Sequence, residues 1–313
     1  MSFQDKQQAF LASIKNKNGK YKRVISSPLR YAGGKTNAVG FIIEALPPID
    51  RLISPFLGGG SVEFAINKIF DIPVIGYDIF DILINYWVWQ INSPEILAMG
   101  LSKLTPNKET YAKIKERLKK HWNKEIALNS LELAIHYFFN HNLSYGPGFL
   151  GWPSSVYMNQ KRYDAILERV RTFKASNFEV KCGSFEQVFQ RYPNDCFYLD
   201  PPYLLNEDAE EILGRPDKEN KMFRGIYPMR NITCHSRGFN HKLLAQLIHN
   251  HKGPVILSYN NCEAVRKLYD GFEQSFPSWS YTMGQGETRI GKNRIEAGNT
   301  HIKKSHEIII KKN

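Results

Sequence analysis

The sequence predicts an α/β fold in which a mostly parallel sheet is interrupted by a helical segment. Over residues 51–95, and again from about residue 176, short apolar runs alternate with helical patterns. This alternation is typical of chains built from strand–helix–strand units. Between the two regions the periodicity is helical. With 313 residues, of which 42% are hydrophobic, the chain is long enough to bury a sizeable core.

The amino-terminal part begins with a polar stretch. Residues 1–23 are basic, and we expect a flexible arm there. From Arg51 the pattern gives a strand at 51–56, a glycine loop and a helix at 62–70. A short strand at 74–78 then ends in an acid, and another helix begins at residue 82.

The middle and carboxy-terminal parts continue this succession. Helical periodicity covers 108–122, 130–139 and 162–173, and the loop 140–155 is rich in Gly, Pro, Ser and aromatic residues. The elements expected after it are strands at 178–185 and 196–200, a polar stretch at 204–237, a helix at 239–250, a strand at 254–259, a helix at 262–272 and two strands within 279–312 joined by a long basic connection.

The charge favours a polyanionic partner. The chain has 42 Lys and Arg against 30 Asp and Glu, a net charge of +12, which is most often associated with nucleic acid. Residues 101–175 alone hold 13 basic and 6 acidic side chains. No run approaches the roughly 18 apolar residues that span a membrane, and the amino terminus does not resemble a signal peptide. We therefore expect a cytoplasmic protein, and the scattered cysteines, without CxxC, predict no metal site.

An unusual turn follows the apolar run at 196–199. The tetrapeptide Asp200-Pro201-Pro202-Tyr203 ends the strand abruptly, because proline cannot donate to a sheet ladder. Ligands of open α/β sheets bind at the carboxyl ends of strands. The tetrapeptide is therefore a candidate site, although an ordinary surface turn would have the same composition.

These residue types suit chemistry on an exocyclic amine of a nucleobase, whose lone pair is delocalised into the ring. Two acceptors aimed at its hydrogens, the Asp200 carboxylate and the Pro201 carbonyl, would draw the nitrogen toward tetrahedral geometry and stabilise positive charge as it develops. The prolines would fix the carbonyl, and Tyr203 would stack on the base.

Two other features are expected near this turn if the sheet is doubly wound. Gly58, Gly59 and Gly60 separate a strand from a helix, where glycine lets a ligand approach the backbone. Asp78 ends the next strand, at about the separation where an acid meets ribose hydroxyls in dinucleotide-binding folds. A nicotinamide-dependent oxidoreductase would explain these two features, but it would leave Asp200 without a role.

Four segments in order resemble the DNA adenine-N6 methyltransferases of the Dam type. They are LRYAGGK (29–35), SPFLGGGSVEF (54–64), the basic helical segment and YLDPPY (198–203). Shorter matches are LINYW (83–87), FFNHNLS (138–144), VILSYNN (255–261) and HEIII (306–310).

The resemblance implies a Rossmann-like methyltransferase sheet, formed by 24–95 plus 176–313, with an inserted helical target-recognition domain at 96–175. The implied cofactor is S-adenosylmethionine, and its implied contacts are Tyr31, Ala32, Gly33, Lys35, Phe56, Gly58, Asp78, Ser184 and Phe185. Ser184 departs from the family, which usually has an acid before this phenylalanine.

The implied reaction is methyl transfer to adenine N6 in duplex DNA, on a base rotated out of the helix and held by Asp200 and Tyr203. Cytosine-N4 methylation and a catalytically silent DNA-binding protein remain alternatives. The implied partner is double-stranded DNA, together with a cognate restriction endonuclease if the chain belongs to a restriction–modification pair. Candidate DNA contacts are Lys113, Arg117, Lys120, Asn140, Asn142, Tyr145, Lys161 and Arg162, although a basic helical face is ordinarily just exposed to solvent.

Overall fold

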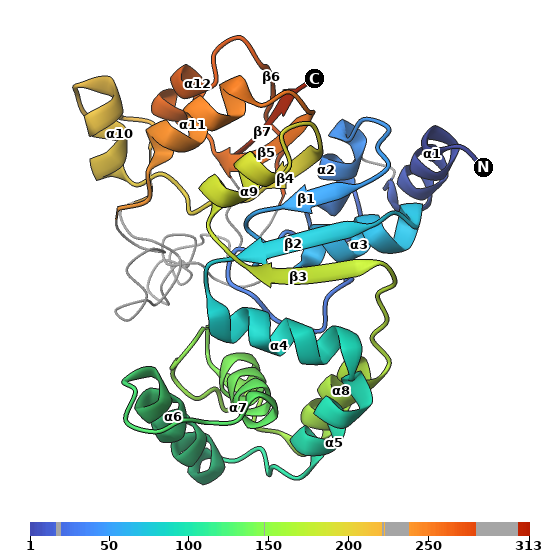
Figure 1. Cartoon of the computed structure of the whole chain (residues 1–313), viewed down its shortest axis with the longest axis vertical. Coiled ribbons are helices and arrows are strands. Elements are labelled where there is room, and N and C mark those ends of the chain that lie inside the picture. Colours follow the sequence, from blue (N-terminus) through green and yellow to red (C-terminus); the bar gives the residue numbers. More distant parts are fainter. Residues whose placement is uncertain (17–19, 147, 221, 223–237, 280–305) are drawn as a thin grey trace, which may run out of the picture.

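The computed structural model describes the chain except for residues 17–19, 147, 221, 223–237 and 280–305. In the described part, seven strands form one sheet in the order β3-β2-β1-β4-β5-β7-β6 (Figure 1). The strands are β1 (Leu52–Ser54), β2 (Val74–Asp78), β3 (Phe178–Cys182), β4 (Cys196–Leu199), β5 (Val255–Asn260), β6 (Glu273–Ser275) and β7 (Glu307–Lys312). Neighbours from β3 to β5 pair in parallel, whereas β7 pairs antiparallel with both β5 and β6. The predicted mixed α/β class, with a mostly parallel sheet, is confirmed.

The helices cover both faces of the sheet. They are α1 (Phe3–Ile14), α2 (Val39–Ala45), α3 (Ser61–Phe70), α4 (Asp81–Asn92), α5 (Pro94–Ser102), α6 (Lys108–Trp122), α7 (Ser130–Leu143), α8 (Gln160–Arg171), α9 (Phe185–Arg191), α10 (Asn206–Leu213), α11 (His241–Asn250) and α12 (Glu263–Leu268). No helix of the described residues is both long and apolar enough to cross a membrane.

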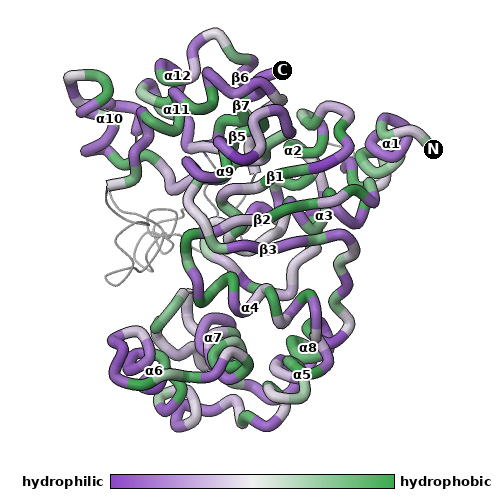
Figure 2. Tube along the Cα trace, viewed as in Figure 1, coloured by the Kyte–Doolittle hydropathy of each residue, from purple (hydrophilic) through white to green (hydrophobic). Residues whose placement is uncertain are grey.

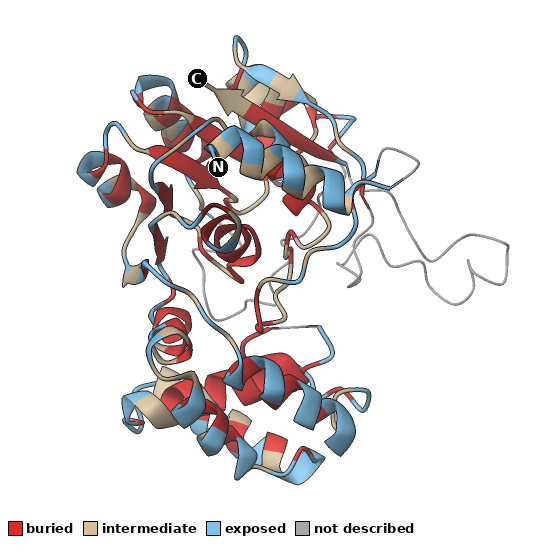
Figure 3. Ribbon diagram, turned by 90° about the vertical axis from the view of Figure 1, so that its right-hand side faces the viewer, coloured by how far each residue is buried: buried red, intermediate tan, exposed pale blue. Residues whose placement is uncertain are grey.

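Two hydrophobic cores separate along the alternation of the strands. In β1, Leu52 belongs to the core beneath α2, α3 and α4, whereas Ile53 belongs to the core beneath α9, α11 and α12. Successive side chains of a strand point to opposite faces, so a strand covered on both sides is hydrophobic throughout. The sheet thus forms the middle of three layers, with helices on both sides. Figure 2 shows the hydropathy of each residue along the chain, and Figure 3 shows that the strands and the helix faces toward them are buried.

The sheet order places three strand ends together. The chain passes from β1 to β2 on one side, and β4 pairs with β1 on the other side. Loops that leave adjacent parallel strands in opposite directions open a crevice at their carboxyl ends. The glycine loop follows β1, Asp78 is the last residue of β2, and Asp200 follows β4.

Helices α5 to α8 form a helical region between α4 and β3, on the side of α4 away from the sheet (Figure 1). As the periodicity predicted, α6 buries Tyr111, Ile114 and Leu118. The hydrophobic residues of this region are continuous with the core that covers one face of the sheet.

The expected flexible arm at 1–23 is wrong for its first part. Residues Phe3–Ile14 form helix α1, which begins with a capping box at Ser2. Phe3 stacks on Phe70 with ring centroids 4.1 Å apart, and Gln7 Nε2 donates to the carbonyls of Ile43 and Leu46, at 2.6 and 2.8 Å. Phe3 and Gln7 lie one helical turn apart, and together they hold this polar helix against the rest of the protein.

Two other expectations change in detail. The polar stretch at 204–237 opens with helix α10, and the helix expected at 262–272 is α12 followed directly by β6. The last expected strand is β7. The strand expected to precede it, after Trp279, and the basic connection fall at 280–305, outside the described residues.

Candidate active site

The glycine loop and the segment around Tyr31 pack directly on one another. Gly58 and Gly60 have φ of 47° and 64°, in the left-handed region that favours glycine. A Cβ on Gly59 would lie 2.4 Å from the Tyr31 Cβ. The triple glycine therefore lets the Tyr31 segment lie against the loop that leaves β1.

Asp78 fixes the same loop from the next strand. Its carboxylate accepts the backbone N–H of Gly58 through Oδ2 and that of Phe80 through Oδ1, both at 3.0 Å. Asp78 is buried. These two bonds set the orientation of the carboxylate.

Asp200 forms an ion pair with Lys35. The Lys35 Nζ lies 2.7 Å from Asp200 Oδ1 and 2.8 Å from Oδ2, and it also donates to the Gly33 carbonyl at 3.0 Å. Lys35 is 4% exposed and Asp200 23%. Burial raises the pKa of Asp200, and the Lys35 ammonium opposes that shift.

Another buried carboxyl, Glu63, lies in the first turn of α3. It accepts a hydrogen bond from Ser54 Oγ at 2.7 Å. Burial raises the pKa of Glu63 to about 7, although the Ser54 bond opposes the shift, and repulsion from Asp200 adds to it. The pKa of one carboxyl near the turn thus lies close to neutrality.

Tyr203 is held from two sides. Its hydroxyl donates to the buried carboxylate of Glu307, on β7. Its ring stacks on Tyr259, at 5.8 Å between centroids, and the Lys35 Nζ lies 4.9 Å from the ring centroid. The antiparallel strand β7 therefore contributes to the position of this aromatic ring.

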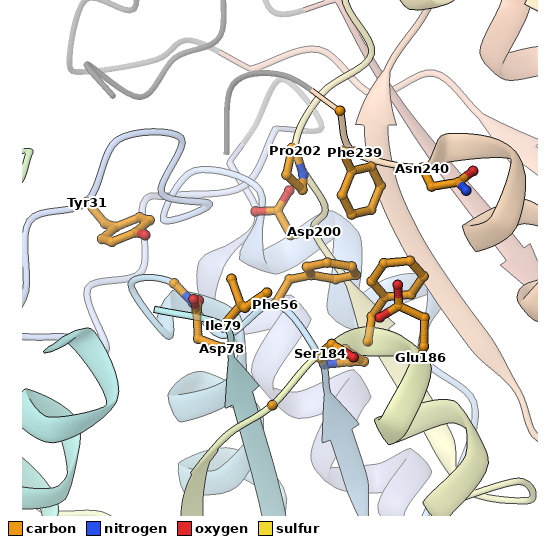
Figure 4. A pocket seen from close by; sticks show the side chains of 15 residues that line it. Tyr31, Phe56, Asp78, Ile79, Ser184, Glu186, Asp200, Pro202, Phe239 and Asn240 are labelled. Carbon is orange, nitrogen blue, oxygen red and sulfur yellow. The ribbon is translucent and has the colours of Figure 1, made fainter. Parts of the chain in front are cut away.

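A cavity of about 210 Å³ opens at the carboxyl ends of the strands (Figure 4). Its described lining residues are Tyr31, Pro55, Phe56, Gly58, Asp78, Ile79, Gly183, Ser184, Phe185, Glu186, Asp200, Pro202, Gly238, Phe239 and Asn240. These residues include three carboxylates and no Lys or Arg, so the described wall favours a ligand that carries positive charge.

Most of the residues expected to bind the cofactor meet at this cavity. Six of the nine line it, namely Tyr31, Phe56, Gly58, Asp78, Ser184 and Phe185. Lys35 lies behind Asp200, and neither Ala32 nor Gly33 is among the lining residues. In the tetrapeptide, Asp200 and Pro202 line the cavity, Pro201 is buried, and Tyr203 is half-buried and packs against the core beside Tyr259.

The expectation that Asn140 and Asn142 contact DNA is wrong for this structure, because both are fully buried. Asn140 Oδ1 accepts the backbone N–H of Leu150, and Asn142 Oδ1 accepts that of Arg30, at 2.8 and 2.9 Å. The Arg30 guanidinium also donates to the Ser144 carbonyl and lies 3.5 Å from the Tyr157 ring centroid. Helix α7 is thereby tied to the segment that contains Tyr31.

The other candidate DNA contacts lie at the surface. Lys113 and Arg117 are exposed and form ion pairs with Glu109 and Glu132. Lys120, Lys161, Arg162 and Tyr145 are also exposed. Trp152, which is compatible with a packing role by sequence alone, is instead 78% exposed, with the Lys115 Nζ 4.9 Å from its ring centroid.

Several residues near the site were not identified from the sequence, and three of them have polar or aromatic side chains that shape it. Glu186 and Phe239 line the cavity, and Glu307 holds Tyr203. Glu186 adjoins Phe185, so the acid expected before this phenylalanine has a counterpart after it. Among the described residues no group of His, Cys, Asp and Glu could hold a metal ion, and the adjacent Cys234 and His235 of the sequence lie outside those residues.

Comparison with known proteins decides the family. A model of the D12 class N6 adenine-specific DNA methyltransferases matches residues 31–284. The chain belongs to this family. Its members are adenine-specific and depend on S-adenosylmethionine, so the predicted family and the adenine-specific activity on DNA are confirmed.

Named relatives agree with this assignment. The chain is 30% identical over 199 residues to type II methyltransferase M.MjaIII of Methanocaldococcus jannaschii, a match that covers 56% of this chain and 68% of that protein. It is 24% identical over 290 residues to modification methylase LlaI of Lactococcus lactis, and 28% identical over 292 residues to type II methyltransferase M.FokI of Planomicrobium okeanokoites. These two matches cover 79% and 87% of this chain but only 44% and 43% of the relatives.

Proposed function

We propose that the cavity holds S-adenosylmethionine while an adenine, rotated out of duplex DNA, binds at the Asp200 turn and is methylated at N6. The observation that carries this proposal is the position of Asp78 and Asp200. Asp78 ends β2 and Asp200 follows β4, the two neighbours of β1, and both line one cavity. One acid therefore lies where a ribose would bind, and the other lies beside the aromatic turn.

The lining fits the parts of this cofactor. Phe56 and Phe185 offer apolar ring surface to a purine, and Asp78 offers acceptors to ribose hydroxyls. When bound, the cofactor supplies a methyl group on a positively charged sulfur, which suits a cavity with three carboxylates.

Asp200 prepares the adenine amine for the displacement. Its carboxylate, held by Lys35, accepts an N6 hydrogen and favours the tetrahedral nitrogen whose lone pair forms the new N–C bond. The methyl group would leave the cofactor's sulfur as the N–C bond forms, and the N6 proton would become acidic. Because burial raises the pKa of Asp200, this carboxylate is a suited acceptor for that proton. Tyr203, fixed by Glu307, contacts the face of the base.

The helical region supplies the DNA surface in this proposal. Rotation of the adenine out of the duplex is required because the amine must reach a cavity at the edge of a sheet. Lys113, Arg117, Lys120, Lys161 and Arg162 would contact phosphates, and Tyr145 would contact bases. Two relatives are named type II methyltransferases and one a modification methylase, so we propose a restriction endonuclease of the same sequence specificity as the functional partner.

Digestion of methylated DNA to nucleosides, followed by mass spectrometry, tests the reaction. We expect N6-methyladenine with the wild-type enzyme and S-adenosylmethionine, and none without the cofactor. Detection of N4-methylcytosine instead would mean that the enzyme methylates the exocyclic amine of cytosine rather than that of adenine. Absence of any modified base, despite DNA binding, would favour a catalytically silent protein of this fold.

A further inference from the structure

One wall of the cavity has an acceptor to which the proposed reaction gives no role. Glu186 follows Phe185 in the first turn of α9 and lines the cavity. Its side chain is neither fully buried nor fully exposed. Among the described residues, no hydrogen bond or ion pair engages its carboxylate.

Three other acceptor side chains of the lining already have partners within the protein. Asp78 accepts two backbone N–H groups, and Asp200 pairs with Lys35. Asn240 Oδ1 caps helix α11 by accepting the Leu243 N–H at 2.9 Å. Glu186 therefore retains the acceptor capacity that a ligand with hydrogen-bond donors needs.

The surroundings of Glu186 define what such a ligand looks like. The rings of Phe56, Phe185 and Phe239 touch one another, with centroids 5.3 to 5.7 Å apart, and form an apolar surface. In Figure 4, Asp78 and Ile79 lie on one side of Phe56, and Ser184 and Glu186 lie on the other side. A nucleoside whose ribose binds Asp78 would thus direct its base over these rings toward Glu186.

We propose that Glu186 accepts the exocyclic amine of the cofactor's adenine and makes the cavity selective for a 6-amino purine. This inference rests on the proposed use of S-adenosylmethionine. A carboxylate accepts hydrogen bonds but cannot donate them. It therefore binds the 6-amino group of adenine and repels the 6-oxo group of hypoxanthine. Ser184, the neighbouring alternative, carries a hydroxyl that both donates and accepts, and it would not discriminate between the two bases.

Calorimetry with two product analogues, S-adenosylhomocysteine and S-inosylhomocysteine, tests the assignment. A hydrogen bond to a charged acceptor corresponds to about a 10- to 100-fold preference for the adenosyl compound in the wild type. Glu186→Gln should reduce this preference to within about threefold, because the glutamine amide can also donate to a 6-oxo group. Ser184→Ala removes the rival acceptor and should keep the wild-type preference for the adenosyl compound.

Each outcome separates this inference from the proposed function. A preference that survives Glu186→Gln, or that is lost in Ser184→Ala instead, overturns the role of Glu186 while cofactor binding stands. If the wild type binds neither compound, the cofactor assignment itself is contradicted. Glu186→Gln should still bind the adenosyl compound, so a loss of binding to both analogues, together with a lower melting temperature, would show that Glu186 is structural.

Discussion

The Lys35–Asp200 ion pair is the contact between individual residues on which the proposed reaction depends most. The sequence indicated Asp200 as an acceptor and Lys35 as a cofactor contact, whereas the structure joins the two within 2.8 Å. The ammonium both holds the carboxylate in place and keeps it charged despite its burial. Truncation of Asp200 also leaves a buried ammonium without its partner, which is strongly destabilising.

Asp200→Asn is the corresponding substitution that preserves size. The methylation rate should fall by about 10³-fold, since the lost charge acts mainly on the transition state. The affinity for S-adenosylhomocysteine should change little. Single-turnover methylation and calorimetry measure the two quantities. Asp195→Asn is the control and should keep the rate. It removes the charge that Arg51 pairs with at the amino ends of β1 and β4, away from the cavity. A variant that retains more than about a tenth of the wild-type rate would disprove the assigned role of Asp200.

Glu63 should make stability depend on pH. Its pKa is about 7 in the folded protein against an ordinary 4.5, so the unfolded chain ionises first as pH rises. The folded state therefore loses about 3 kcal/mol between pH 4.5 and 7. Glu63→Gln removes this loss, so its stability relative to wild type should increase over that interval. Denaturant unfolding at pH 5 and pH 8 measures the effect, with the exposed Glu95→Gln as control. A pH-independent difference between E63Q and wild type would mean that Glu63 ionises normally.

At the level of structural elements, the end of β2, the glycine loop and the Tyr31 segment form one unit. Asp78 holds the loop through the Gly58 N–H, and the loop in turn supports Tyr31, where a Cβ on Gly59 would collide. Arg30 and Asn142 connect this unit to helix α7. The wall of the cavity is therefore assembled from three stretches distant in sequence.

Asp78→Ala should weaken cofactor binding by about 10- to 100-fold, because ribose hydroxyls lose a charged acceptor and the loop loses its anchor. DNA affinity without cofactor should be nearly unchanged. Calorimetry with S-adenosylhomocysteine and an equilibrium DNA-binding assay report the two affinities. Asp81→Ala, three residues further along and exposed, is the control. Equal cofactor affinity in D78A and wild type would remove Asp78 from the site.

The whole molecule is electrostatically divided. The described cavity wall has three carboxylates and no Lys or Arg, whereas residues 101–175 contain 13 basic side chains against 6 acidic ones. A polyanion would therefore be drawn to the helical region, and a small cationic ligand to the end of the sheet. Neutralisation of phosphates releases condensed counterions, so DNA affinity should fall steeply with salt.

Lys120→Ala and Lys161→Ala should each weaken binding to all DNA sequences similarly and reduce the salt slope by about one unit. Lys252→Ala is the matched control. This lysine is exposed and lies just before the amino end of β5, outside the helical region. A salt titration of duplex binding compares the variants. Identical slopes for all three would mean that the lysines of the helical region face solvent rather than DNA.

The sequence predicted the elements whose signals are local. Alternating apolar runs, the triple glycine and the Asp200 tetrapeptide indicated the sheet, the loop and the turn, and the order of the segments indicated the family. Helix α1 was missed because its anchors, Phe70 and the carbonyls of Ile43 and Leu46, are remote in sequence. The pairing of β7 with β5, which brings Glu307 to Tyr203, likewise leaves no local signal.

The sequence by itself determined the α/β class, the family and the acids at the ends of two strands, because strand periodicity and turn chemistry are properties of neighbouring residues. Only the tertiary structure decided what each polar side chain faces. Asn142 has the composition of a base-reading residue but accepts the Arg30 N–H in the interior, while Glu186 reaches the cavity and Lys35 reaches Asp200. Burial and partnership depend on which distant segments pack together, and that packing minimises unpaired polar groups over the whole chain rather than within any one motif.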